Sequence, residues 1–166
     1  MSISSDQIRD YLRLAYDVAA KSPDRSNQNG AVIIDNLGSI AAGCNTFTPG
    51  ITWTEKQLEN RDWKLQYIEH AERSAIFEYT KSAVRTSYPI MICPWFACAE
   101  CARAIVLSGI IKVIGHRERM DMTPERWLKS VEAGREILVK SGVTLSYHSG
   151  KIGGDPIIVN GETWQP

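Results

Sequence analysis

Short apolar segments alternate with helical segments through the second half of this 166-residue chain. A helix that opens near Cys98 and another that runs from Pro124 to about Ser141 lie between segments with the length and apolar content of buried strands, namely 88–95, 110–116 and 143–148. Strands joined through helices lie parallel and are connected by right-handed crossovers. This half of the chain therefore predicts a parallel sheet covered by helices.

Local signals set the ends of the last helix. Thr123 followed by Pro124 is typical of an N-cap and a first helical residue, and Gly142 suits the position just after a helix end. We therefore expect this helix to begin at Pro124.

The first half of the chain predicts a helix and a hairpin. Ser4 and Gln7 resemble a capping box, and apolar residues then recur at helical spacing to about residue 21. Segments 31–35 and 39–47 are separated by a short turn that ends in Gly38, which favours two antiparallel strands. The order α-β-β-α-β-α-β-α-β predicts a mixed five-stranded sheet.

Two further segments show no regular pattern. Segment 48–67 is predicted to be a long polar and aromatic loop, and loops of that length are usually functional. The tail, residues 150–166, is rich in Gly and Pro, and we expect it either to wrap over the domain or to form a subunit contact. At this length we expect one domain over residues 1–166.

Charge and hydropathy exclude several classes of function. Nineteen basic and nineteen acidic residues give zero net charge, so we do not expect a nucleic-acid substrate. The N-terminus lacks the pattern of a signal peptide, and no apolar run is long enough to span a bilayer. We therefore expect a cytoplasmic protein with no membrane contact, in which the four cysteines serve packing, metal binding or catalysis.

His70 and Glu72 begin one helix, and Cys98 and Cys101 open a later one. A Cys-x-x-Cys pair at a helix N-terminus can hold one metal ion with both thiolates, which the helix dipole helps to ionise. One His and two Cys leave a fourth tetrahedral position open, as in catalytic zinc sites. The His-x-Glu and Cys-x-x-Cys layout is that of zinc nucleobase deaminases, in which the glutamate moves protons.

Each half of this pattern has a simpler explanation when it is taken alone. A lone histidine such as His70 is more often a core residue, and a Cys-x-x-Cys motif also occurs as a thiol redox pair or as half of a structural zinc site. A redox pair would leave His70 and Glu72 without a role. The two motifs together therefore favour zinc chemistry.

The sequence resembles the zinc-dependent cytidine and deoxycytidylate deaminase superfamily over roughly residues 10 to 148. Segments 69–76 (EHAERSAI) and 98–114 (CAECARAIVLSGIIKVI) are similar to the two zinc segments of that family. Segments 22–35 and 41–51 resemble its first loop and strand and its Gly-Tyr-Asn-Gly stretch. Within the superfamily, the deoxycytidylate deaminases are the most similar.

The resemblance implies a three-layer α/β/α sandwich with the cytidine deaminase-like fold. It implies one Zn²⁺ per subunit, held by His70, Cys98 and Cys101, with Glu72 as the proton shuttle. Family members form hexamers or smaller homo-oligomers, so self-association is expected.

The resemblance also implies substrate contacts. Asn45 corresponds to the asparagine that would hold a sugar hydroxyl, and Ala71 between His70 and Glu72 is a further expected contact. A phosphate needs cationic or N–H donors, and the chain offers two groups of candidates: Arg25, Ser26 and Asn27 before the first strand, and Lys56, Arg61 and Lys64 in segment 48–67.

Three positions depart from the family pattern: Ala97 stands where a proline usually precedes the first Cys, Thr46 replaces a glycine, and Ser74 replaces an asparagine. No metal ligand is lost. We therefore expect hydrolysis of a free cytosine nucleotide, dCMP to dUMP and ammonia. The alternatives are deamination of another amino-heterocycle (a modified pyrimidine nucleotide, guanine, a pterin-like ring or a tRNA adenosine) and a non-catalytic, zinc-stabilised binding subunit.

The other reactive and aromatic residues have simpler expected roles. Cys44 and Cys93 are expected to be buried, and His116 and His148 to lie in the core or at the surface. Packing is the more common role of a tryptophan, but pocket-lining candidates are Trp53, Trp63 and Trp95. Helical spacing predicts core packing for Trp127, Val131, Gly134 and Leu138.

Overall fold

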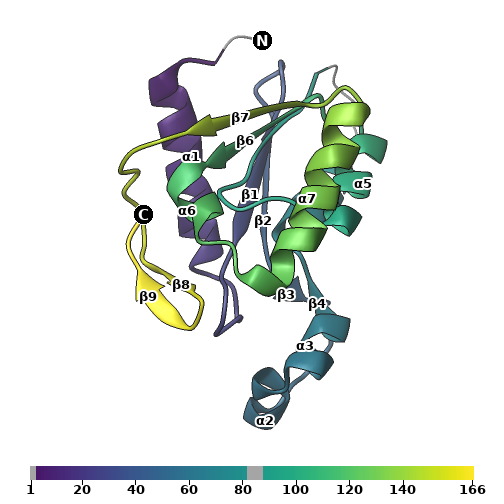
Figure 1. The fold of residues 1–166 in the computed structure, drawn as a ribbon, viewed down its shortest axis with the longest axis vertical. Coiled ribbons are helices and arrows are strands. Elements are labelled where there is room, and N and C mark those ends of the chain that lie inside the picture. Colours follow the sequence, from purple (N-terminus) through teal and green to yellow (C-terminus); the bar gives the residue numbers. More distant parts are fainter. Residues whose placement is uncertain (1–2, 82–87) are drawn as a thin grey trace.

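A mixed five-stranded sheet forms the centre of the protein (Figure 1). The computed structural model describes residues 3–81 and 88–166. The strand order is β2-β1-β5-β6-β7; β1 runs antiparallel to both neighbours, while β5, β6 and β7 are parallel. The bounds are β1 (Gly30–Ile34), β2 (Ile40–Cys44), β5 (Ile90–Ile92), β6 (Lys112–His116) and β7 (Thr144–His148). The predicted mixed sheet is confirmed.

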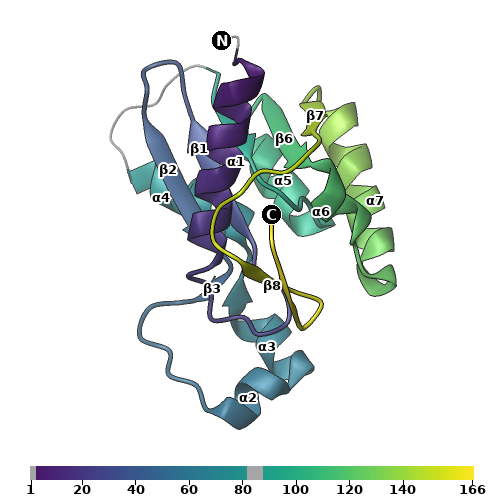
Figure 2. The same cartoon turned by 90° about the vertical axis from the view of Figure 1, so that its left-hand side faces the viewer.

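Helices cover both faces of this sheet, which gives the expected three layers (Figures 1 and 2). One face carries α1 (Ser5–Ala19), and the other carries α4 (Ala71–Lys81), α5 (Ala99–Leu107) and α7 (Glu125–Lys140). Alternate residues of β1 point to opposite faces, so Val32 packs beneath α1 while Ile33 packs beneath the three helices. A strand covered on both faces is apolar throughout, as β1 is.

Two helix ends test the local signals. The capping box at α1 is present, with Ser4 Oγ 3.2 Å from Gln7 N and Gln7 Oε1 3.0 Å from Ser4 N. At α7 the predicted start is one residue early, because Pro124 is the N-cap and Thr123 Oγ1 instead donates to Met120 O. Gly142, with φ +82°, follows the end of α7 as expected.

The prediction of a loop at 48–67 is wrong. This segment contains α2 (Glu55–Glu59) and α3 (Arg61–Tyr67), and β4 (Ile68–Glu69) then pairs with β3 (Thr46–Phe47). Thr54 and Gln57 form a second capping box, a sequence signal of the same type as the one at Ser4. The aromatic side chains of the segment pack on Phe47 and so give these short helices an apolar contact.

The tail wraps over the domain, which is one of the two arrangements expected for it. It forms a hairpin of β8 (Ile157–Val159) and β9 (Glu162–Trp164), and Figure 2 shows it on the α1 side of the sheet. Ile152, Ile157 and Val159 are buried in the same apolar cluster as α1. A short helix, α6 (Arg117–Asp121), follows β6 and was not predicted.

One glycine allows α7 to approach the segment before α5 closely. A Cβ atom on Gly134 would lie 2.1 Å from the main-chain oxygen of Ala97. Only a residue without a side chain fits this contact. Gly134 and Leu138 are buried, as the helical spacing predicts.

Among residues 3–81 and 88–166, no helix is long and apolar enough to cross a membrane.

Candidate zinc site and substrate pocket

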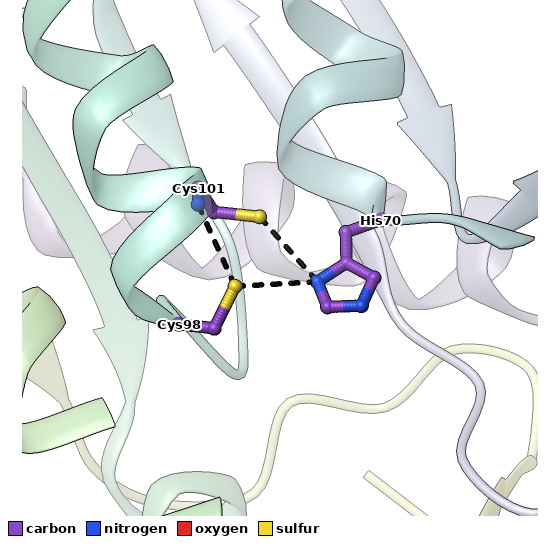
Figure 3. Close-up of side chains that lie close together, drawn as sticks. All are labelled: His70, Cys98 and Cys101. Carbon is purple, nitrogen blue, oxygen red and sulfur yellow. Dashed lines mark hydrogen bonds between the residues drawn. The ribbon is translucent and has the colours of Figure 1, made fainter. Parts of the chain in front are cut away.

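His70, Cys98 and Cys101 meet where α4 and α5 begin (Figure 3). His70 Nδ1 lies 3.5 Å from Cys98 Sγ and 3.4 Å from Cys101 Sγ, and the three ligand atoms all lie within 4.8 Å of one another. The two helices lie on the same face of the sheet, but α4 is preceded by β4 of the small β3–β4 sheet, not by a parallel strand. The predicted grouping of the three side chains is found.

The two thiols share protons unequally. Cys98 is the N-cap of α5, and its Sγ accepts from the main-chain N–H of Cys101. Hydrogen bonds from the Cys101 thiol and from His70 lower the pKa of Cys98 to about 3. The same bond to Cys98, together with burial, raises the pKa of Cys101. A metal ion would replace the proton between the two sulfurs.

Glu69 holds the main chain of His70, and Trp127 packs against its imidazole ring. The main-chain N–H of His70 donates to Glu69 Oε1 at 2.8 Å, and the ring of Trp127 packs edge-on against the imidazole, with centroids 5.8 Å apart. Burial favours a lower pKa for His70, but the hydrogen bond to Cys98 and the charge of Glu72 outweigh burial and raise it.

The donor set fits zinc. One imidazole nitrogen and two thiol sulfurs are soft to borderline ligands of the kind that zinc takes in tetrahedral sites, and three protein ligands leave one position for water or substrate. In the part of the chain that the structure describes, this is the one group of three such side chains close enough to share an ion.

Glu72 lies beside this group and is buried, with 3% of its surface exposed. It lines the same cavity as His70 and Cys98. Burial raises the pKa of its carboxyl group, and the neighbouring Cys98 thiolate adds to that rise. A carboxyl group with a raised pKa holds a proton more readily than an ordinary glutamate, which suits a group that both takes and gives a proton.

Arg73 is a part of the site that sequence reasoning missed. Its guanidinium lies 3.8 Å from Cys101 Sγ and is fixed by ion pairs to Glu69 and Glu100. A cation here favours a thiolate at Cys101. The available signal was an arginine directly after the His-x-Glu motif.

A cavity with about 890 Å³ of empty space, partly open to solvent, adjoins His70, Cys98 and Cys101, the candidate metal-binding group. Five of the predicted substrate residues lie outside segment 48–67, and four of these line the cavity: Ser26, Asn27, Asn45 and Ala71. The fifth, Arg25, does not; it is exposed and pairs with Glu55. Since Ala71 is the first residue of α4, helix geometry supplies no acceptor for its main-chain N–H.

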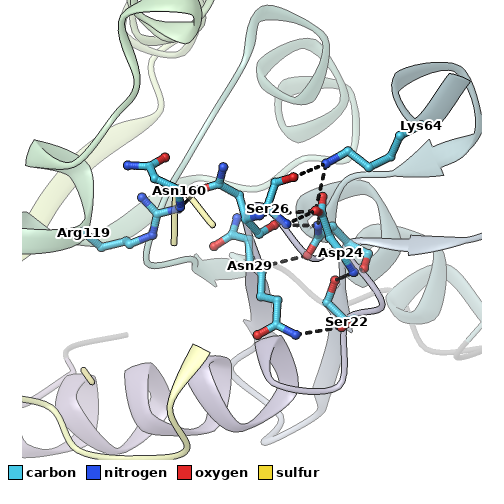
Figure 4. Close-up of polar contacts among 10 residues, drawn as sticks. Ser22, Asp24, Ser26, Asn29, Lys64, Arg119 and Asn160 are labelled. Carbon is cyan, nitrogen blue, oxygen red and sulfur yellow. Dashed lines mark hydrogen bonds and ion pairs between the residues drawn. The ribbon is translucent and has the colours of Figure 1, made fainter. Parts of the chain in front are cut away.

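Asn45 organises the loop on one side of the cavity. Figure 4 shows polar contacts of this loop at Ser22, Asp24 and Asn29. Asn45 Oδ1 accepts from the main-chain N–H of Asn29 at 2.8 Å, and its Nδ2 donates to Asn27 O at 2.9 Å and to Asp24 Oδ2 at 3.2 Å. Both amide hydrogens are therefore used within the protein. One lone pair of Oδ1 remains for a ligand.

The cations at the cavity differ in their availability. Lys64 lines it but is buried against Asp24 and Ser26. Arg61 and Arg126 also line it, and neither has an ion pair or a side-chain hydrogen bond within the described ranges. Lys56 lies outside the lining, and Arg126, at the start of α7, was not among the predicted contacts.

Of the tryptophans considered as pocket-lining candidates or core residues, some line the cavity and others do not. Trp95 and Trp127 line the cavity and pack edge to face, with centroids 6.2 Å apart at 87°. Trp53 and Trp63 instead pack on Phe47. Trp127 thus packs against the core, as predicted, and also lines the cavity.

The remaining cysteines and histidines lie away from the cavity lining. Cys93 is buried as predicted, whereas Cys44 is only half-buried, because it lies on the edge strand β2. His116 is buried, with Nδ1 2.6 Å from the hydroxyl of Tyr16. His148 is half-buried in β7.

Comparison with known proteins agrees with this geometry. The family profile described as "Cytidine and deoxycytidylate deaminase zinc-binding region" matches residues 5–116. The mouse deoxycytidylate deaminase is 29% identical over 140 residues, which cover 81% of this chain and 75% of the mouse protein. An uncharacterised deaminase of Aliivibrio fischeri is 25% identical over 137 residues, or 82% of this chain and 90% of the relative.

A solved structure shares the fold. The dCMP deaminase of cyanophage S-TIM5, in complex with dCMP and dUMP, superposes with a TM-score of 0.65 over 89% of this chain and 100% of the phage chain, at 20% identity. The family profile covers 112 residues, from 5 to 116, well over half of the chain. The chain therefore belongs to the cytidine and deoxycytidylate deaminase family of zinc-binding hydrolases.

Proposed function

We propose that this protein hydrolyses the amino group of a free cytosine nucleotide, converting dCMP and water to dUMP and ammonia. The observation that carries the proposal is the buried carboxyl group of Glu72 in one cavity with His70, Cys98 and Asn45. The relatives named deoxycytidylate deaminase, at 28–29% identity, support this choice of substrate.

The proposed metal is one Zn²⁺ per chain, held by His70 Nδ1, Cys98 Sγ and Cys101 Sγ. When bound, zinc lowers the pKa of a coordinated water molecule, which supplies a nucleophile near neutral pH. Arg73 supports the thiolate at Cys101, and Trp127 keeps the His70 ring in place.

Glu72 is the proposed proton shuttle. It accepts a proton from the attacking water and delivers a proton to N3 of the cytosine ring, which makes C4 more electrophilic. The water oxygen then bonds to C4. Glu72, ionised again after protonating N3, takes the remaining proton from the new C4 hydroxyl group and passes it to the amino group. The C4–N bond breaks and ammonia leaves. The raised pKa of Glu72 suits a group that must hold a proton between these steps.

The proposed substrate contacts follow from the free donors and acceptors of the cavity. Asn45 Oδ1 accepts a hydrogen bond from a sugar hydroxyl, and the main-chain N–H of Ala71 donates to the base. Arg61 and Arg126 are the cations available for a phosphate. Ser26 and Asn27 complete the wall beside Asn45.

We further propose that residues 1–166 act as one deaminase domain in the cytoplasm and as a homo-oligomer. The zero net charge supports a small-molecule substrate over a nucleic acid.

Ammonia release tests the proposal. Zinc-loaded protein is assayed on cytosine, adenine and guanine bases, nucleosides and nucleotides, with Glu72→Gln as the catalytic variant and Glu78→Gln, an exposed position on the same helix, as the matched control. We expect turnover of dCMP, a loss of about 10³-fold in Glu72→Gln with zinc retained, and wild-type rates in Glu78→Gln.

Three results would contradict the proposal. Wild-type protein that is silent on every cytosine compound would refute the substrate, and turnover of another amino-heterocycle would then identify the alternative. Full activity in Glu72→Gln would refute the role of Glu72. Loss of zinc in this variant would show that Glu72 is a ligand.

A further inference from the structure

The side-chain amide of Asn27 is fixed in one orientation. Its Oδ1 accepts from Arg119 Nη2 and from the main-chain N–H of Asn160, each at 3.1 Å. Both partners can only donate, so a flipped amide would place its NH₂ group against two donors. The oxygen must therefore point towards Arg119 and Asn160.

The other end of this amide is left for a ligand. Asn27 Nδ2 has no acceptor among the residues that the structure describes, although the residue is 92% buried and lines the cavity. The main chain of Asn27 is also held, because its N–H donates to Asp24 Oδ1 and its oxygen accepts from Asn45. Asn27 thus offers a positioned donor at the cavity wall.

Arg119 is fully buried behind this wall (Figure 4). Its guanidinium lies 4.5 Å from the centre of the Trp95 ring, and in the described part of the chain it forms no ion pair. Nε and Nη1 have no hydrogen-bond partner there either. Asn27 and Trp95 line the cavity, whereas Arg119 does not. Arg119 therefore acts on the cavity through these two residues.

A charged donor on Oδ1 strengthens Nδ2 as a donor. Hydrogen bonds to an ionised group are stronger than neutral ones, and hydrogen bonds in series polarise one another. The guanidinium draws electron density from the amide oxygen, so the Nδ2 hydrogens of Asn27 become more positive and favour an oxygen acceptor.

The tail fixes the same loop from outside. Gln28 N donates to Ile158 O at 2.8 Å, Ile158 N donates to Gln28 Oε1 at 2.8 Å, and Gly161 N donates to Ser26 O at 2.9 Å. Arg119 and the hairpin both lie beyond the part of the chain that matches the family profile, which ends at residue 116. The cavity wall thus depends on segments outside that match.

We propose that Asn27 Nδ2 donates a hydrogen bond to an oxygen of the substrate, and that Arg119 and the β8–β9 hairpin are its positioning elements. This inference rests on the proposed function, because it assumes a nucleotide in the cavity. It adds a specificity determinant at Asn27 and a positioning residue at Arg119.

The test compares steady-state kinetics of Asn27→Asp, Arg119→Met and Arg119→Lys on dCMP and deoxycytidine. Asn27→Asp keeps the acceptor for Arg119 and removes the donor. Arg119→Lys keeps one charged donor. Arg117→Met makes the matched change two residues away, where the guanidinium lies over Tyr147.

We expect KM to rise about tenfold or more in Asn27→Asp and Arg119→Met, with a smaller change in kcat and unchanged zinc content. Arg119→Lys should recover part of the loss, and Arg117→Met should resemble the wild type. An effect on dCMP alone locates the acceptor on the phosphate, whereas an effect on both substrates locates it on the sugar or base.

A wild-type KM in folded Arg119→Met would overturn the inference. If Arg119→Met does not fold, Asn27→Asp becomes the test. A wild-type KM in Asn27→Asp would then overturn the inference.

A second measurement needs no substrate, so it separates this inference from the proposed function. Thermal unfolding of Asn27→Ala, Arg119→Met and the double variant reports whether the two side chains are coupled, because each single variant removes the hydrogen bond between them. We expect the double variant to lose less in Tm than the sum of the single losses. Additive losses would overturn the positioning role even in an active enzyme, and coupled losses would support it even if dCMP is not the substrate.

Discussion

Lys64 Nζ lies 2.8 Å from Asp24 Oδ1, and both side chains are at least 90% buried. Lys64 also donates to Ser26 Oγ at 3.1 Å. The pair joins α3 to the loop before β1, which are 40 positions apart in the chain. A buried pair of this kind fixes the wall of the cavity because neither charge can be left alone.

Replacing Lys64 by Met should destabilise the protein by about 3 kcal/mol, because it leaves the Asp24 carboxylate buried without its partner. Urea unfolding measures the loss. The exposed Lys56→Met on α2 is the matched control and should change stability by less than about 0.5 kcal/mol. Equal stabilities of the two variants would show that the buried pair contributes nothing.

Gly134→Ala should be destabilising although alanine is the better helix former. Propensity alone favours the change by about 1 kcal/mol, but the new Cβ would lie 2.1 Å from Ala97 O. Displacing Ala97 moves the adjacent proposed ligand Cys98, so we expect a net loss of about 1–3 kcal/mol and weaker zinc retention. Calorimetry and zinc analysis check this, with the exposed Glu132→Ala on α7 as control. A higher Tm in Gly134→Ala would contradict the close contact.

Cys101→Ser should abolish stoichiometric zinc binding and lower Tm, because a serine hydroxyl is a much poorer zinc ligand than a thiolate. Chelation of the wild-type protein should produce the same fall in Tm, and added zinc should reverse it. Cys44→Ser lies outside the metal-binding group and should keep its zinc. The measurement is the zinc content of dialysed wild-type and variant protein. Full zinc content in Cys101→Ser would exclude Cys101 Sγ as a zinc ligand in the wild type.

Stability should fall in acid through His116. Burial lowers the pKa of His116, and His148 lowers it further, while the Gly150 carbonyl and Glu118 oppose the shift. Tyr16 faces the ring from α1. Since the native pKa lies below the unfolded value of about 6.5, the unfolded chain binds more protons below that pH. Neutral His116 therefore makes its full contribution to the free energy of unfolding above about pH 6.5. This contribution is lost as the pH falls towards and through the native pKa of His116.

His116→Gln isolates this contribution. The free energy of unfolding is measured in urea from about pH 7.5 to about pH 5 for both proteins. The wild type should lose more stability than His116→Gln over that range. Parallel curves would mean that His116 has the same pKa in the native and unfolded states.

Much of the fold follows from local pattern in the sequence. The strands of the second half were predicted from short apolar segments between helices, and the cap of α1 was predicted from the spacing of Ser4 and Gln7. The residues of each signal lie within a few positions of one another in the sequence. The helices α2 and α3 were missed because their sequence lacks an apolar period, although Thr54 and Gln57 carry a capping signal. Their stability comes from aromatic packing on Phe47, a contact that composition does not show.

The grouping of His70, Cys98 and Cys101 could be predicted because each of them lies in a recognisable motif. The cavity wall could not, because it depends on pairs that are far apart in sequence. Arg119 and Asn27 are 92 positions apart, and Asn160 and Asn27 are 133 apart. Arg25 looked equivalent to its neighbours in the loop, but the fold turns it outward to Glu55.

The edge-to-face pair of Trp95 and Trp127 provides an optical reporter at the cavity. Two indoles this close share excitation energy, so their near-ultraviolet circular dichroism depends on their relative orientation. A planar base that enters the cavity will quench or reorient this signal. Occupancy can thus be followed in unlabelled Glu72→Gln protein, in which ligand would persist without being consumed.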